Sequence, residues 1–136
     1  MTAQRRRFRV RVDAANIFLL EDFILSFPFS DSALAARTLL IATELFENIT
    51  EHSKGFACPY RGVTVNLTNT GDKTEMRFSY ATRNFSELTG AEKKARPYFD
   101  RAAGRYRGMG LLMCRKLSAS MIYKKGLFKS TIMIIL

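Results

Sequence analysis

The stretch ELFENITEH, from Glu44 to His52, places a carboxylate, an amide and an imidazole at intervals of four residues. Four residues are close to one turn of an α-helix, so Glu44, Asn48 and His52 fall on one side of a helix. Apolar residues such as Leu45 and Ile49 recur around them at helical intervals, and the three polar residues border that apolar face. The stretch therefore predicts either a ligand site at the edge of a long helix or the ordinary solvent-facing border of a core helix.

The residues before this stretch predict one strand and two helices. Residues 5–12 alternate arginine with mostly apolar residues, which is typical of a strand. Residues 14–27 carry apolar residues at helical intervals, and Pro28 ends that helix. The helix that contains ELFENITEH begins near residues 30–32, where serine and aspartate can cap it, and ends near residues 54–55.

The residues after it predict two hairpins that flank a loop and a helix. Residues 62–68 and 74–80 form strands joined by a turn, and residues 121–125 and 130–136 form a second pair. Residues 82–107 form a long, basic and irregular loop, and RGMGL (107–111) opens a helix. This order predicts an α+β fold: a two-layer sandwich of a mixed, mostly antiparallel sheet covered on one face by helices.

Composition indicates one globular domain over residues 1–136. The chain is 47% hydrophobic and 25% charged, which suits a domain with its own core. Its uncharged apolar runs are far shorter than the roughly 18 residues that cross a bilayer, and its N-terminus lacks the apolar core of a signal peptide. We therefore expect a soluble, cytoplasmic protein without a membrane partner. Cys58 and Cys114 match no metal or redox spacing, and we expect reduced thiols, with Cys114 buried on a helix.

The formal charge of +10 predicts an anionic partner: phosphates, acidic proteins or nucleic acid. Arg5, Arg7, Arg9 and Arg11 share one face of the first strand. This pattern is typical of a solvated strand face, and the alternative is a nucleic-acid surface. The chain contains no helix-turn-helix, zinc-finger or aromatic binding signature, so nucleic acid is the less favoured partner.

Two motifs in order, ELFENITEH and RGMGL, with a hairpin between them and a strand pair after them, resemble a known family. It is the histidine kinase-like ATPase domain shared by gyrase-type topoisomerases, histidine kinases and mismatch-repair ATPases. Within it, the chain looks most like the stand-alone anti-sigma factor serine kinases of bacteria. The resemblance covers nearly the whole chain and implies ATP and Mg²⁺ as cofactors.

The resemblance assigns roles to the helix residues. Asn48 would give its amide oxygen to the Mg²⁺ that bridges the triphosphate, since a hard cation prefers oxygen ligands. Glu44 would be the catalytic residue that orients or deprotonates the attacking hydroxyl, which in the anti-sigma kinases belongs to a serine of a partner protein. His52 would lie near the phosphates.

The resemblance also assigns the glycine-rich motif to the phosphates. Gly108 and Gly110, with Met109 between them, would let the backbone approach the nucleotide, and the helix that opens at Leu111 would supply amide donors. The basic segment 86–107 would form a lid over the polyphosphate. The alternatives are a tightly packed loop-to-helix junction and an ordinary solvated loop.

The base end departs from the family. Members carry Asp-x-Gly-x-Gly after the strand that here reads EMRFSY, and its aspartate binds the adenine amino group. Tyr80 stands in the place of that aspartate, and Thr82 and Asn84 replace the glycines. A tyrosine offers no carboxylate, and losing a charge-assisted hydrogen bond costs about 1.5–3 kcal/mol. Thr131 would lie near the adenine.

Two functions follow from the resemblance. The first is an anti-sigma-type regulator that binds a sigma factor and/or phosphorylates a serine of an antagonist protein with ATP and Mg²⁺. The second is an ATP-independent protein-binding regulator of the same fold. Glu44 and Asn48 favour the first, whereas the missing aspartate favours the second and weighs against ATP and Mg²⁺. Stand-alone relatives commonly dimerise, so a homodimer is also considered.

Overall fold

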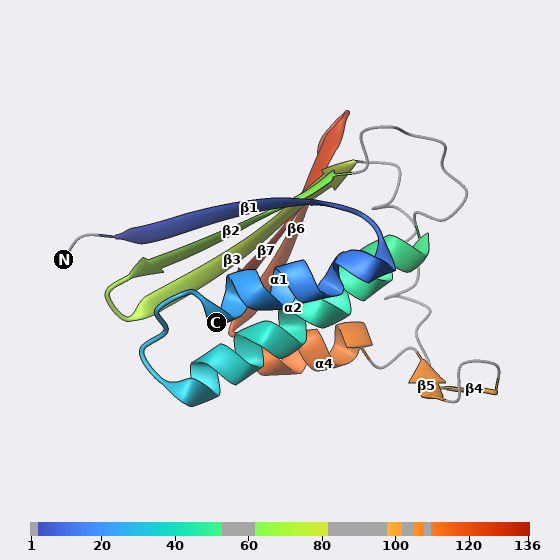
Figure 1. Cartoon of the computed structure of the whole chain (residues 1–136), viewed down its shortest axis with the longest axis horizontal. Helices are drawn as coiled ribbons and strands as arrows, with labels where there is room; N and C mark the ends of the chain where they lie inside the picture. Colours follow the sequence, from blue (N-terminus) through green and yellow to red (C-terminus); the bar gives the residue numbers. More distant parts are fainter. Residues whose placement is uncertain (1–2, 53–61, 82–97, 102–104, 108–109) are drawn as a thin grey trace.

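The computed structural model describes residues 3–52, 62–81, 98–101, 105–107 and 110–136 (Figure 1). Its helical elements are the 3₁₀ turn η1 (Ala14–Asn16), α1 (Ile17–Leu25), α2 (Ser32–His52) and α4 (Gly110–Leu117). Its strands are β1 (Gln4–Arg11), β2 (Gly62–Thr70), β3 (Lys73–Ala81), β4 (Tyr98–Asp100), β5 (Arg105–Arg107), β6 (Ser120–Lys125) and β7 (Lys129–Ile135).

Five strands form one sheet, and the helices lie against one face of it (Figure 1). The strand order is β1-β2-β3-β7-β6, and every neighbouring pair is antiparallel. The two-layer α+β sandwich predicted from the sequence is thus confirmed. The described sheet has β1 and β6 at its edges, so each of these strands has one side that no described strand pairs with.

Alternation along the strands decides which face the helices cover. Val10 pairs with Val63, Val65 with Phe78 and Phe78 with Ile132, so the apolar residues line up across the sheet on one face. All of these residues are buried beneath the helices. The first predicted strand is confirmed as β1, and its arginines at positions 5, 7, 9 and 11 are exposed on the opposite face.

Helix α2 supplies the other half of the core. Its start is capped by Asp31, whose Oδ1 accepts a hydrogen bond from the backbone N–H of Leu34 at 2.7 Å. Ile41, Leu45, Phe46 and Ile49 are fully buried at helical intervals, as the sequence predicts. The helix therefore presents one apolar face to the sheet, and the border of that face carries the polar residues of interest.

Helix α1 is shorter than the predicted span of residues 14–27. The chain first makes the turn η1, where Oδ1 of Asp13 accepts a hydrogen bond from the N–H of Ala15 at 3.0 Å. At the other end the hydroxyl of Ser26 donates to the carbonyl of Phe23, and the N–H of Phe27 bonds to Ile24. These local bonds take the place of regular helical ones at both ends.

The predicted irregular loop over residues 82–107 is wrong in part. Strands β4 and β5 pair there antiparallel, with Tyr98 opposite Arg107 and Asp100 opposite Arg105. Each strand has three residues, which is too short for alternation to reveal. Apart from Arg101, which follows β4, the remaining residues of the predicted loop, and therefore most of the predicted lid, lie outside the described residues. No helix in the described part of the chain is long and apolar enough to cross a membrane.

Candidate functional site

The two sequence motifs meet where α4 begins against α2. A Cβ atom placed on Gly110, the first residue of α4, would overlap Oε2 of Glu44. It would also lie 3.3 Å from Cδ of Glu44 and 3.5 Å from Nδ2 of Asn48. Gly110 has no positive φ, so the glycine is favoured here by the close approach of the Glu44 side chain and not by its backbone conformation.

The amide of Asn48 has a fixed orientation. Its Nδ2 donates a hydrogen bond to the backbone carbonyl of Glu44 at 2.8 Å, and the side chain is partly buried. Because the nitrogen is engaged with the helix, the amide oxygen is the atom through which Asn48 can serve a ligand. An oxygen donor at this place fits the predicted contact with Mg²⁺.

The Glu44 carboxylate lies at the positive end of a helix dipole. The first turn of α4 contains no acidic residue of its own, and Glu44 of α2 brings a negative charge to it. The backbone amides at a helix start bind anions, and the predicted phosphate position is the same helix start. A phosphate bound here would therefore lie near the Glu44 carboxylate, which is also negatively charged.

Cys114 completes this cluster, and the sequence reasoning did not connect it to the site. It lies one turn after Gly110, is fully buried as predicted, and its Sγ is 3.9 Å from the carbonyl oxygen of Ile41. Burial raises the pKa of the Cys114 thiol to about 12, and the charge of Glu44 acts in the same direction. The helical spacing from Gly110 was the signal that could have placed Cys114 beside Glu44.

Tyr80, at the predicted base end, lies in the hydrophobic core. It is on the helix-facing side of β3 and is only 2% exposed. Burial raises the pKa of its phenol well above the ordinary range, with a further contribution from Tyr123. A ring packed in this way occupies space that the family's aspartate would leave to the base, so Tyr80 does not fit adenine recognition of that kind.

The structure does not bring Thr131 to Tyr80. Tyr80 pairs with Ser130 across β3 and β7, whereas Thr131 pairs with Ser79 and is on the other face of the sheet. Oγ1 of Thr131 lies 3.5 Å from Oγ of Ser79. Ser130, which is fully buried, is the hydroxyl residue on the helix-facing side. The strict alternation of β7 was the signal that favoured Ser130 over its neighbour.

Other predicted site residues are placed only in part. His52 is the last residue of α2 and Leu111 the second residue of α4, but their side chains lie outside the described part of the structure. Gly108 and Met109 lie outside the described residues altogether. Within the described residues, no group of three or more His, Cys, Asp and Glu side chains could hold a metal ion. The predicted Mg²⁺ does not need one, because it would be held by Asn48 and the phosphates.

We predict that Gly110→Ala destabilises the protein although alanine is the better helix former. The new Cβ would displace the Glu44 carboxylate from the helix start, and the loss of its interaction with the dipole of α4 costs about 0.3–1 kcal/mol. In a Glu44→Ala background the same change should be neutral or stabilising, by up to about 1 kcal/mol. Urea unfolding of the four proteins in this double-mutant cycle, followed by circular dichroism, measures the coupling. Stabilisation by Gly110→Ala alone would contradict the close approach of α4 to α2.

We also predict that the Cys114 thiol of the folded protein resists alkylation. In a Cys58→Ser background at pH 8, iodoacetamide should modify Cys114 only as fast as the protein opens, because the thiol is buried and protonated.

Since the folded pKa of the Cys114 thiol is raised from 9.0 to about 12, its contribution to the free energy of unfolding is complete below pH 9 and declines as the pH rises towards 12. Glu44→Gln should lower the folded thiol pKa and so reduce the loss of unfolding free energy above pH 9, measured by the pH profile of urea unfolding. An unchanged profile would place the carboxylate away from the thiol.

Comparison with known proteins supports the fold. No protein-family model matches the chain, and no curated protein sequence matches it significantly. Among solved structures, the chain is similar to one from "The crystal structure of SiaB-SiaC complex from Pseudomonas aeruginosa", with a TM-score of 0.66 and 15% sequence identity. The match covers 96% of this chain and 89% of that one. At this identity the similarity shows a shared fold over nearly the whole chain.

Proposed function

We propose that this protein is an anti-sigma-type regulator that acts by binding partner proteins and that binds ATP weakly or not at all. The observation that carries the proposal is the fold that it shares, over nearly its full length, with a chain crystallised in a complex of two proteins, SiaB and SiaC. The order of the ELFENITEH and RGMGL motifs supports the same assignment. By resemblance to the anti-sigma kinases, the partners would be a sigma factor and an antagonist protein.

The buried phenol of Tyr80 supports the ATP-independent form of this function. The family recognises adenine through an aspartate, and here the corresponding residue is an aromatic ring in the core. A nucleotide would therefore have to be held mainly by its phosphates. Those would meet the helix start at Gly110, where the Glu44 carboxylate already supplies negative charge.

An ATP-dependent serine kinase is the second candidate, and the contact between α2 and α4 favours it. Gly110, Glu44 and Asn48 lie close together. A kinase would need such a group: Gly110 for phosphate binding, Glu44 for activation of a hydroxyl and Asn48 for Mg²⁺ binding. In that case Asn48 would hold the metal, and Glu44 would orient the serine hydroxyl of the partner or accept its proton. The bound Mg-ATP would supply the phosphoryl group.

We predict that Mg-ATP binds more weakly than micromolar in a calorimetric titration, because the charge-assisted contact to the base is missing. Tyr80→Asp should tighten binding, since it restores the carboxylate and removes the ring. Tyr80→Phe keeps the ring and should leave binding unchanged, which makes it the matched control. Circular dichroism checks that both variants fold. Should Tyr80→Asp fail to fold, Tyr80→Ser removes the ring without burying a charge and tests whether the ring blocks the nucleotide. A submicromolar constant for the unaltered protein would disprove the loss of the base site.

We predict for the kinase candidate that Glu44→Ala abolishes phosphate transfer to a partner serine and leaves partner binding intact. The reason is that Glu44 would act on the reacting hydroxyl and not on the partner's surface. Radiolabelled phosphate transfer and a pull-down with the same partner measure the two properties separately. If transfer survives the substitution, Glu44 is a structural residue that supports the start of α4 and does not act on the hydroxyl. The kinase assignment itself fails if the unaltered protein transfers no phosphate to the partner.

A further inference from the structure

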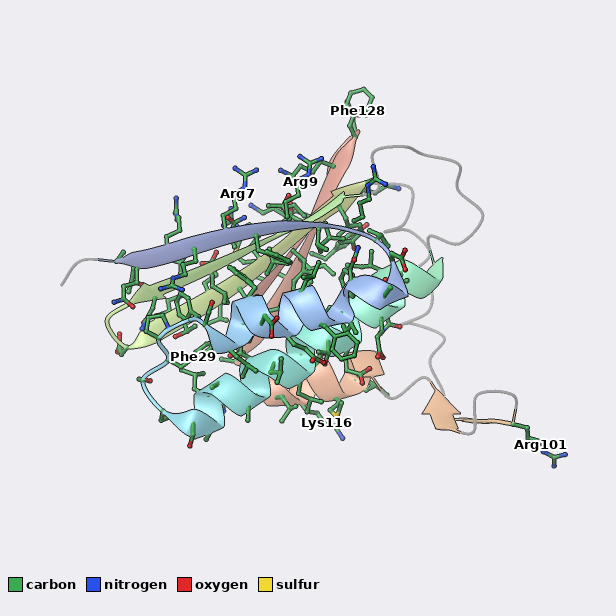
Figure 2. All side chains as sticks on the ribbon, in the orientation of Figure 1. Arg7, Arg9, Phe29, Arg101, Lys116 and Phe128 are labelled. Carbon is green, nitrogen blue, oxygen red and sulfur yellow. The ribbon has the colours of Figure 1, made fainter. Side chains whose placement is uncertain are left out.

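The face of the sheet that the helices leave uncovered is cationic. Arg5, Arg7, Arg9 and Arg11 occupy alternate positions of β1 and are exposed on this face. Figure 2 shows the side chains of Arg7 and Arg9 pointing away from the helical layer. Alternate residues of a strand are about 6.5–7 Å apart, so the four arginine side chains leave the backbone in a regular row along the edge of the sheet.

The strand register extends this character across the sheet. Following each pairing from β1 to β6 places the exposed basic residues of the other strands on the same face: Lys73 and Arg77 of β3, Lys124 of β6 and Lys129 of β7. The one carboxylate among the strand residues of this face is Glu75, which is 3.0 Å from Nη2 of Arg77. The positions of β2 between the arginines carry short polar side chains, such as Thr64, Asn66 and Thr68.

Strand β1 is also an edge. It pairs with β2 on one side, and no described strand pairs with its other side. An unpaired strand edge presents backbone N–H and C=O groups that can accept a further strand. The cationic row and the unpaired edge belong to the same eight residues, Gln4–Arg11.

We propose that β1 binds an extended acidic segment of a partner protein, which adds to the sheet as a sixth strand. Backbone hydrogen bonds would join the two strands, and carboxylates at alternate positions of the segment would lie beside Arg5, Arg7, Arg9 and Arg11. Residues opposite each other on paired strands have Cβ atoms about 4.5–5.5 Å apart, which lets opposite charges attract across the pair. This inference rests on the proposed function only in taking a protein as the partner, and it does not use the site between α2 and α4.

A second copy of this chain fits the edge poorly. Two β1 strands related by a twofold axis would pair antiparallel and set arginines against arginines, and like charges opposite each other destabilise such a pair. Nucleic acid is also less well matched. The strand residues of this face include no aromatic side chain on which bases could stack.

The test uses a fluorescein-labelled peptide of eight residues in which glutamate alternates with threonine. Fluorescence anisotropy should show binding that weakens with salt, and amide NMR should place the shifts on residues 4–11. A peptide with the same composition but four glutamates in one block should bind more weakly, because it cannot match the row.

Arg7→Glu should weaken binding about fivefold. Lys116→Glu is the matched control, since it reverses one exposed charge on α4, and it should change binding less than twofold.

Several results would overturn the proposal. These are no binding of the alternating peptide, equal effects of Arg7→Glu and Lys116→Glu, or shifts that map to β6. Tighter binding of duplex DNA with a steep salt slope would make the face a nucleic-acid surface instead. A dimer in analytical ultracentrifugation, with the β1 amides protected from hydrogen exchange, would make it a self-interface.

Arg7 lies on the opposite face from Tyr80, so the Mg-ATP titration of Arg7→Glu should be unchanged. The failure of this inference is therefore distinguishable from failure of the proposed function.

Discussion

The candidate site depends on how closely α4 approaches α2. The backbone of Gly110 lies against the carboxylate of Glu44 and near the amide of Asn48, and a side chain at position 110 would displace the Glu44 carboxylate. This contact brings together two motifs that are far apart in the sequence. It also places a negative charge at a helix start that lacks an acidic residue of its own, which stabilises the dipole of α4. The same charge helps to keep the neighbouring Cys114 thiol protonated.

The two ends of the site differ in chemistry. At the proposed phosphate end, the backbone of Gly110 lies beside the Glu44 carboxylate and near the amide nitrogen of Asn48, which is bonded to the carbonyl of Glu44. At the base end, Tyr80 and Ser130 are buried within the sheet and helix layers. The resident carboxylate at the phosphate end could activate a hydroxyl or could replace an anionic ligand, and these two roles separate the kinase from the regulator that acts by contact alone.

The sheet separates two kinds of surface. Its helix-facing side is apolar and carries the core and the candidate site. Its other side carries the arginines of β1 (Figure 2) and further basic residues, with Ile122, Met133 and Ile135 at the β6–β7 end. Among the described residues, eight exposed lysines and arginines lie on this face: Arg5, Arg7, Arg9, Arg11, Lys73, Arg77, Lys124 and Lys129. A regulator that binds proteins can use such a face for a partner while the opposite side responds to a nucleotide or remains structural.

The sequence by itself determined the fold class, because local alternation and helical periodicity act over a few residues and state which face of each element is apolar. It also determined the long helix with Glu44 and Asn48, the two hairpins of the main sheet and the burial of Cys114. Only the tertiary structure decided which residues face one another. The strand register put Ser130, and not Thr131, beside Tyr80, and helix packing put Gly110 on Glu44. The alternation of β7 indicates locally that Ser130 faces the helices. Which residue lies opposite it, and how closely the helices approach, is set by pairing register and side-chain volume between segments distant in the chain.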